Sequence, residues 1–333
     1  MKQFLNTNAE NVATEVSNRD LHPSRDWPGH CRGRSPRRAG VYDGACAEST
    51  SDWGYRLGAL GGWWQLDEPH LRYPTQSPRV SAPRRRAGGF LMAQLRDDGV
   101  ILRTYRLGEA DRIVVAMTRH HGKVRAVAKG VRKTTSKFGS RLEPLTYVSL
   151  LLWRGRSDLD IVNQAEVIKR YWNIREDYTR MSSGQIMLEV IDQITQEGQQ
   201  DERVLETLTK ALRVLDDPER DPMLVAPAFF LRILELEGAG PVVDRCVSCG
   251  DDDVALVAFD LNEGGALCQQ CRRGRPLSPE ALLLLQRILG GDLGSVLTGT
   301  PPEGAHEVDA LATEAMEVHL DRRLKAPRAL TGL

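Results

Sequence analysis

Four cysteines in the second half of the chain place the strongest constraint on how it can fold. Cys246-Val-Ser-Cys249 and Cys268-Gln-Gln-Cys271 form the pattern C-x2-C-x18-C-x2-C. Two such knuckles separated by about 15–20 residues are typical of a zinc ribbon, in which four thiolates bind one tetrahedral ion. Residues 254–260 and 266–267 are predicted to form a hairpin that carries the second knuckle back to the first. We therefore expect a structural Zn²⁺ site and a zinc finger over residues 246–271, with these ligands: Cys246, Cys249, Cys268 and Cys271.

Other uses of the cysteines fit the pattern less well. A thioredoxin-type redox pair needs one C-x2-C within a βαβ unit, and a catalytic zinc needs an open position that four thiolates would close. The nucleobase-deaminase signature, H-x-E with P-C-x-x-C, is absent from the sequence. Iron in the same site and four cysteines without a metal stay open as alternatives. Cys31 and Cys46 lie outside the pattern, and we assign them no role.

Charge is distributed unevenly along the chain, although the formal net charge is zero. Residues 92–170 hold 16 Lys and Arg against 8 Asp and Glu, whereas residues 171–333 hold 16 against 28. This asymmetry predicts a polyanion-binding module followed by a module with another task. The apolar runs are far shorter than the ~20 residues that cross a bilayer, and residues 1–20 have no signal-peptide core. We expect a cytoplasmic protein that does not contact a membrane.

Residues 1–91 differ in composition from the remainder of the chain. Arg accounts for 12 of their 13 basic residues, four of the six Trp fall here, and no window keeps a helical or strand period beyond a turn or two. One interpretation is a disordered basic arm with weak attraction for phosphates. The other, which we favour, is that this leader precedes a true start at Met92. In either case the leader is excluded from the predicted fold.

Five short strands are predicted between residues 92 and 170. In the first, Ile101, Arg103 and Tyr105 are expected to share one face, and Val100, Leu102 and Thr104 the other, because side chains alternate along a strand. Five strands within about 75 residues favour a small Greek-key barrel of the OB type. Their predicted ranges are 99–107, 113–118, 123–129, 147–153 and 160–166.

Cationic side chains are concentrated on the exposed parts of this predicted barrel. Period two places Lys123 and Arg125 opposite Val124 on the third strand, and the following loop, 130–144, is too polar and basic to form core. Such groups displace counterions from a nucleic-acid backbone without reading its sequence. Each charge taken alone fits a solvated face, but the excess over the segment favours a binding surface; Tyr105 fits base stacking as well as a core position. The predicted DNA contacts are Arg103, Arg106, Lys123, Arg125, Lys129, Arg132, Lys133, Lys137 and Arg141.

The period changes to 3.6 after residue 182, which indicates a helical domain over residues 171–333. Ser278 as N-cap and Pro279 at the first position open one helix, and residues 238–241 (Gly-Ala-Gly-Pro) end another. The apolar stripes predict a bundle core. The fold class is therefore α+β: an N-terminal OB-type barrel, then a helical domain with an inserted ribbon. Helices are predicted at 183–197, 202–215, 228–237, 280–289 and 307–324.

The order of these parts resembles the RecO family of DNA repair proteins. Residues 98–105 (DGVILRTY) are similar to that family's first barrel strand, residues 107–112 (LGEADR) to its first turn, and residues 122–130 (GKVRAVAKG) to its third strand. The resemblance covers about residues 92–325 and is carried mainly by the barrel and the cysteines. The leader has no counterpart in it.

The resemblance implies a non-enzymatic mediator of DNA repair and homologous recombination in the RecFOR pathway. Such a protein binds single- and double-stranded DNA, anneals complementary strands, and works with RecR at DNA coated by single-strand-binding protein, where it assists loading of RecA. By position, the DNA contacts fall on the barrel residues named above, and the metal stabilises its domain. A nucleoid-associated location in the cytoplasm follows.

Two rival functions stay open. The first is a zinc-ribbon scaffold for protein–protein contacts, whose cationic module docks an acidic partner and does not bind DNA directly. The second is a nuclease, for which Asp251, Asp252 and Asp253 form the only dense acidic cluster; we interpret them as a solvated turn. The absence of a G-x4-G-K-[ST] sequence argues against an ATP-driven motor.

Overall fold

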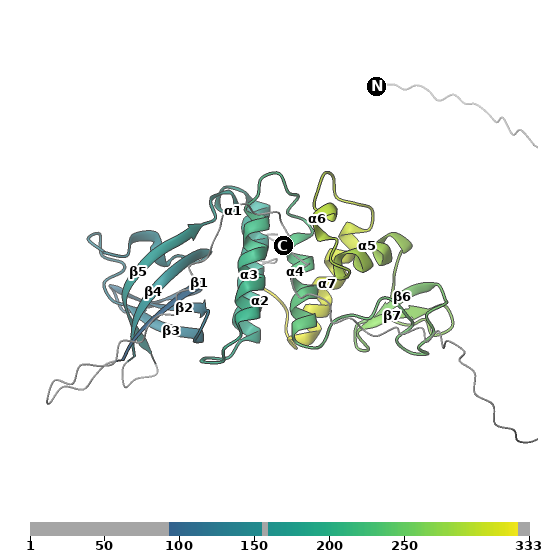
Figure 1. Ribbon diagram of the computed structural model, residues 1–333, viewed down its shortest axis with the longest axis horizontal. Helices are drawn as coiled ribbons and strands as arrows, with labels where there is room; N and C mark the ends of the chain where they lie inside the picture. Colours follow the sequence, from purple (N-terminus) through teal and green to yellow (C-terminus); the bar gives the residue numbers. More distant parts are fainter. Residues whose placement is uncertain (1–92, 155–158, 326–333) are drawn as a thin grey trace, which may run out of the picture. The chain divides into compact units, whose positions relative to one another are not determined.

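The computed structural model describes residues 93–154 and 159–325. The predicted leader, with Cys31 and Cys46, lies outside the described residues. In the described ranges five strands come first and are followed by helices with a small sheet between them (Figure 1), so the α+β class is confirmed. No helix in these two ranges combines the length and the apolar character needed to cross a bilayer.

The first five strands form a closed barrel with the order β1-β2-β3-β5-β4. All neighbours are antiparallel except β3 and β5, which pair in parallel over Ala126–Asp160 and Val127–Ile161 alone. Alternation is clearest in β3, where Val124 and Ala126 are buried and Lys123 and Arg125 are partly exposed, as the sequence predicts. The strands are β1 (Ala93–Leu107), β2 (Asp111–Thr118), β3 (Gly122–Ala128), β4 (Thr146–Arg154) and β5 (Asp160–Arg170).

A register shift in β1 corrects the predicted faces of that strand. Ile101 pairs with Ala116, but Arg103 pairs with Val115, so Leu102 is an extra residue and forms a bulge. Ile101 belongs to the core inside the barrel, whereas Leu102 belongs to the core that the barrel shares with the helices. The bulge reverses the phase of the alternation, and the prediction that Ile101 and Arg103 share a face is wrong.

The loop between β3 and β4 contributes to the core, contrary to the prediction that it is too polar to do so. Phe138 and Leu142, each 2% exposed, lie in the cluster that fills the barrel. Leu142 ends a short 3-10 helix, η2 (Gly139–Leu142). Two apolar side chains thus fix the loop to the barrel, while its cationic side chains remain at the surface.

Six helices and one helical turn form the second part of the described chain. The first is α1 (Trp172–Glu176), a single turn that is too short to give a periodic signal in the sequence. N-caps set the start of three others: the carboxylates of Asp177 and Asp201 and the hydroxyl of Ser278 accept hydrogen bonds from backbone amides of the first turn. The remaining elements are α2 (Tyr178–Ile194), α3 (Glu202–Leu215), α4 (Val225–Leu236), α5 (Pro279–Leu289), α6 (Leu293–Val296) and α7 (Ala305–His319).

The bounds of α3 and α5 agree with the predicted segments to within one residue, whereas those of the other three predicted helices differ. One of these, α4, begins at Val225, three residues before the predicted start. The first long helix begins at Tyr178, five residues before the predicted start, because Asp177 caps it, and it ends at Ile194, because Thr195 is extended. The last ends at His319 and not at residue 324. The prediction for 202–215 agrees with α3 at both ends.

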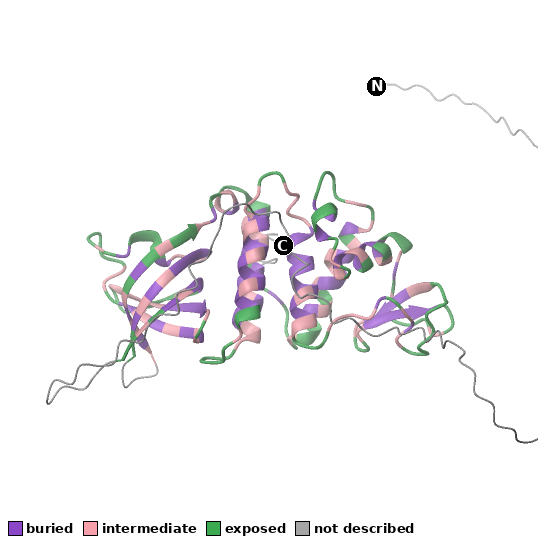
Figure 2. Ribbon diagram, in the orientation of Figure 1, coloured by how far each residue is buried: buried purple, intermediate pink, exposed green. Residues whose placement is uncertain are grey.

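The barrel and the helices share one hydrophobic core. Val100, Leu102, Val115 and Met117 on the outer surface of β1 and β2 belong to the same buried cluster as the apolar side chains of α2, α3 and α4. Figure 2 shows buried residues, in purple, in the strands of the barrel and in α2, α3 and α4. The helices therefore cover one end of the outer face of β1 and β2.

A small sheet is inserted between α4 and α5. Its order is β7-β6-β8, with β6 (Leu256–Asp260) antiparallel to both β7 (Gly265–Cys268) and β8 (Arg275–Pro276). β6 and β7 form the predicted hairpin. The pairing of Leu256 with Cys268 confirms that β7 carries a cysteine back along β6.

Candidate metal centre and nucleic-acid interface

Two tight turns position the four cysteines. In the first, the amide of Gly250 donates to the carbonyl of Cys246 (2.8 Å), and Gly250 adopts a φ of +77° that favours glycine. The amide of Val247 donates to the carbonyl of Ala266 (2.9 Å) and so ties this turn to β7. The second turn follows β7 directly. Both knuckles therefore lie at the same end of the hairpin.

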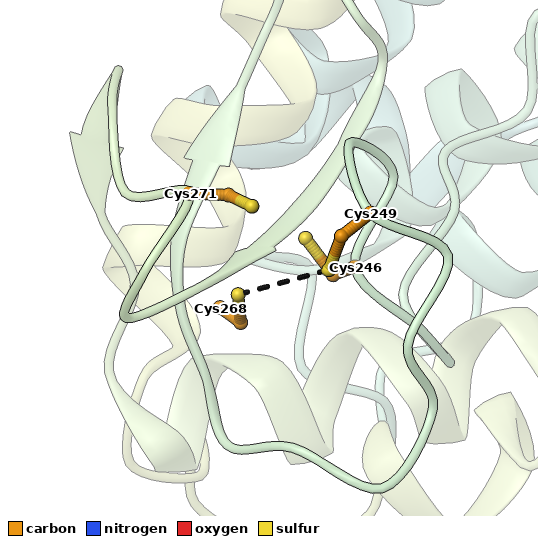
Figure 3. Close-up of side chains that lie close together, drawn as sticks. All are labelled: Cys246, Cys249, Cys268 and Cys271. Atoms are coloured by element: carbon orange, nitrogen blue, oxygen red, sulfur yellow. Dashed lines mark hydrogen bonds between the residues drawn. The ribbon is translucent and has the colours of Figure 1, made fainter.

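The four sulfur atoms face one another at this end (Figure 3). They all lie within 4.8 Å of one another, and the sulfur atoms of Cys249 and Cys268 are 3.9 Å apart. In a tetrahedral site with Zn–S bonds of ~2.3 Å, the sulfurs are ~3.8 Å apart, so the cysteines fit such an ion. Cys246 and Cys268 are buried, and Cys249 is exposed. The predicted set is brought together as one site that is able to hold a metal ion.

Local hydrogen bonds prepare one thiol for ligation. Burial opposes ionisation of Cys246, but the backbone amides of Cys268, Cys249 and Ser248 outweigh it and lower the pKa of this thiol to about 6. Because the thiolate is the form that binds a metal, this environment favours ligation near neutral pH. A hydrogen bond with Cys268, together with burial, raises the pKa of Cys271 to about 12.

The part of the barrel's outer face that the helices leave uncovered carries a cross-strand row of partly exposed side chains. Because residues directly opposite in an antiparallel pair share a face, the register defines an open row of Tyr105, Ile113 and Val127. Tyr105 is 40% exposed, and the other two side chains are partly exposed. The open row is thus an apolar strip with an aromatic ring at one end.

Beside it lies a boundary row of Arg103, Val115 and Arg125, next to the helices. The guanidinium of Arg103 lies 4.9 Å from the ring centroid of Tyr105, a cation–π contact that joins the two rows.

Carboxylates of the helical domain already engage three of the predicted DNA contacts. Asp192 on α2 lies 2.6 Å from Arg103 and 3.5 Å from Lys123, and Lys123 also donates to the carbonyl of residue 192 (2.7 Å). Lys123 is only 13% exposed. Arg125 pairs with Glu197 at 3.2 Å, where both side chains are accessible to solvent. These three cations lie at the junction of the barrel and the helices.

A second group of predicted contacts gathers at the end of the barrel away from the helices. The amide of Arg132 donates to the carbonyl of Ala110 (3.0 Å), and the amide of Gly130 donates to Asp111 (2.7 Å). These bonds hold the start of the loop against the β1–β2 turn. They bring together four exposed cations, one near the end of β1 and three after β3: Arg106, Lys129, Arg132 and Lys133.

Lys137 and Arg141 occupy a third position, further along the same loop. The ammonium of Lys137 donates to the carbonyl of Asn163 on β5 (2.6 Å), and Arg141 donates to the carbonyl of Lys137 (2.6 Å). Neither forms an ion pair with a carboxylate in the part of the chain that the structure describes, and both side chains are exposed. The nine predicted residues therefore fall into three groups on one barrel.

Comparison with known proteins decides the family. The profile described as Recombination protein O N terminal matches residues 92–171, and the profile described as Recombination protein O C terminal matches residues 175–328. The chain belongs to the RecO family. The barrel lies in the N-terminal RecO match, and the four cysteines lie in the C-terminal RecO match.

Curated RecO proteins match over nearly their whole length. The DNA repair protein RecO of Frankia casuarinae is 44% identical over 239 residues, which cover 71% of this chain and 97% of that protein. The RecO of Streptomyces coelicolor is 39% identical over 71% of this chain and 98% of its own length, and that of Bifidobacterium longum is 37% identical over 72% and 99%. The RecO family assignment agrees with the resemblance found in the sequence.

Sequence reasoning missed two features of this RecO barrel. Ile113 and Val127 were treated only as strand residues, because nothing in a sequence says which outer positions the helices cover. The pairing of Arg103, Lys123 and Arg125 with Asp192 and Glu197 was also missed, since these partners are about 70 or more residues apart in the chain. The acidic balance of the second domain was the available signal, but it did not specify a partner.

Proposed function

We propose that this chain is a recombination mediator that binds single- and double-stranded DNA without sequence specificity. One observation carries the proposal: in a member of the RecO family, a barrel displays an open row of Tyr105, Ile113 and Val127 between two cationic groups. An aromatic ring stacks on any base, and Lys and Arg follow any phosphate chain. The strand order 1-2-3-5-4 supports an OB-type barrel, the kind of fold that commonly binds nucleic acid in this way.

The same surface accounts for strand annealing. Cations that neutralise phosphates lower the repulsion between two complementary strands and let them approach. The proposal extends to the setting that the RecO family implies: with RecR, the chain assists loading of RecA on DNA coated by single-strand-binding protein, in the cytoplasm and at the nucleoid. Support for this extension comes from the family assignment and the relatives described as DNA repair proteins.

The four cysteines are proposed to bind Zn²⁺ in a structural role. Four thiolates at these separations would close a tetrahedral shell and leave no position for a reactive water. The ion would hold the two knuckles together, and no chemical step is assigned to it. The chain is accordingly proposed to act without enzymatic activity. Release of label from DNA incubated with the purified protein and Mg²⁺ would contradict this.

The experiment that tests DNA binding is charge reversal in the loop between β3 and β4. The double variant K133E/R141E should weaken binding to all oligonucleotide sequences alike and should lower the slope of log affinity against log salt, since each lost phosphate contact removes about 0.7–0.9 from it. A matched control, R287E/R323E, makes the same change of charge on helical-domain residues whose side chains are 39% and 74% exposed. A double variant that binds as tightly as the wild type and has the same salt slope would contradict the assignment of this loop to DNA binding.

A zinc-ribbon scaffold without direct DNA binding is the second candidate. The engagement of Arg103, Lys123 and Arg125 by carboxylates favours it, because it shows that this barrel face accepts acidic protein groups. A gel shift with non-specific single-stranded DNA at low salt separates the two candidates. A shifted band supports the mediator, and its absence with metal-replete protein supports the scaffold.

A further inference from the structure

The connection between α2 and α3, residues 195–201, lies against the barrel at the boundary row. The amide of Gly198 donates to the carbonyl of Lys123 (3.1 Å), and Lys123 and Glu197 form an isolated parallel β-bridge. Gly122, at a φ of +63°, is so close to Gln199 that a Cβ there would overlap the carbonyl of Gln199. The connection thus pairs with the free edge of β3, where β5 does not reach.

This backbone pairing delivers a carboxylate to one cation of the proposed DNA surface. Glu197 Oε1 lies 3.2 Å from Arg125, and the two side chains are 49% and 40% exposed. Arg125 shares the boundary row with Arg103 and lies beside Val127 of the open row. A phosphate that follows the open row would meet the same guanidinium. Glu197 therefore binds the cation that such a phosphate would bind.

The three ion pairs at this junction differ in how easily they are displaced. Asp192 is almost fully buried and holds Lys123, which is itself 13% exposed, so DNA reaches neither group without separating barrel and helices. The pair of Arg125 and Glu197 is open to solvent. Exposed pairs contribute little to stability and are screened by salt, so an incoming phosphate is able to replace the carboxylate.

Resting on the proposed DNA binding, we infer that Glu197 is a competitor built into the fold: it neutralises Arg125 when DNA is absent, yields it to a phosphate when DNA binds, and so limits affinity. The connection is held by its backbone hydrogen bonds, not by the ion pair. Removing the carboxylate therefore frees Arg125 without displacing residues 195–201.

The test is Glu197→Gln in the full chain, measured by fluorescence anisotropy with a fluorescein-labelled oligothymidylate over a series of NaCl concentrations. The variant should bind about 1.5- to 5-fold more tightly at low salt, the change that corresponds to the 0.2–1 kcal/mol of an exposed pair. Its salt slope should change little, because the same phosphate contact forms in both proteins. The thermal unfolding temperature should equal that of the wild type, which shows that the connection is in place.

A control and a double-mutant cycle separate this competition from a general effect of charge. Glu219→Gln makes the same change of charge on an exposed side chain of the α3–α4 connection and should leave affinity within error of the wild type. In an Arg125→Gln background, Glu197→Gln should no longer tighten binding, because the cation it would free is gone.

Each outcome bears on the inference. Tighter binding by E197Q alone, abolished in the R125Q background, supports it. Equal tightening by E197Q and E219Q, unchanged or weaker binding by E197Q, or tightening that persists without Arg125 overturns it while the proposed function stands. Failure of the wild-type chain to bind the oligonucleotide overturns the proposed function and this inference with it.

Discussion

Asp192→Ala is the change that most directly tests how barrel and helices are held together. The Asp192 carboxylate, 4% exposed, has the guanidinium nitrogen of Arg103 2.6 Å from Oδ2 and the ammonium of Lys123 3.5 Å from Oδ1. Oδ2 has no aligned hydrogen-bond donor, so its contact with Arg103 is an ion pair. Removing one partner of a buried pair costs about 3–5 kcal/mol, because it leaves an uncompensated charge.

The structure places the expected loss at the lower end of that range. Arg103 is half exposed, and water therefore takes over part of the solvation of its charge. Lys123 keeps its hydrogen bond to the carbonyl of residue 192, which Ala also supplies. We therefore expect a loss of about 3 kcal/mol in the free energy of unfolding. For a domain of 150–250 residues this lowers the unfolding temperature by about 6–12 °C.

The assay is thermal and urea unfolding followed by circular dichroism. Asp253→Ala, the same substitution at an exposed position, serves as control and should stay within about 0.5 kcal/mol of the wild type. The double variant D192A/K123A should lose less than the sum of the single losses, since it leaves no buried charge unpaired and the remaining Arg103 is half exposed. A D192A protein as stable as the control, or single losses that add, would refute the role given to this ion pair.

Three other changes test the site and its surroundings. Tyr105→Leu should weaken binding of single-stranded DNA about 5- to 150-fold, the range for one stacked base. Tyr105→Phe, and Tyr178→Leu as a control at another exposed tyrosine, should leave binding unchanged. Equal effects of Y105L and Y178L would contradict base stacking on Tyr105. Cys268→Ser should bring the zinc content, measured by mass spectrometry, below one ion per chain and lower the unfolding temperature, and zinc retained in full would show that this sulfur is no ligand. The amides of Asn262 and Glu263 and the side chain of Arg273 outweigh burial and hold the pKa of Asp260 below its ordinary value. The stability that this gives is present above about pH 4 and is lost as pH falls through the lower pKa of the native state. In Asp260→Asn the unfolding temperature should therefore fall less steeply as pH drops below 4, and a profile like that of the wild type would contradict this.

Local patterns predicted the elements that obey local rules. The hydrophobic period of residues 202–215 specified α3 because Asp201 caps it and an uninterrupted apolar stripe follows. Likewise, alternation in β3 separated buried Val124 from Arg125, since that strand has no bulge. The spacing of the cysteines predicted their convergence, because a hairpin of that length returns the second knuckle to the first.

Predictions failed where the outcome depended on contacts between distant segments. The alternation of β1 gives no sign of the bulge at Leu102, which appears only once β1 pairs with β2. Phe138 and Leu142 lie in a polar loop, and the hole that they fill exists only after the barrel has closed. Short elements such as α1 have too few residues for a period.

The sequence by itself determined that the chain has a cationic strand-rich part, an acidic helical part and a four-cysteine site, because composition, period and spacing are local properties. Only the tertiary structure decided which cations stay available. It buries Lys123 against Asp192, places Glu197 against Arg125, and leaves Tyr105 and the cations of the loop between β3 and β4 exposed. The physical reason is that a charge acts through its neighbours in space, and residues about 70 positions apart become neighbours only through the packing of α2 on the barrel.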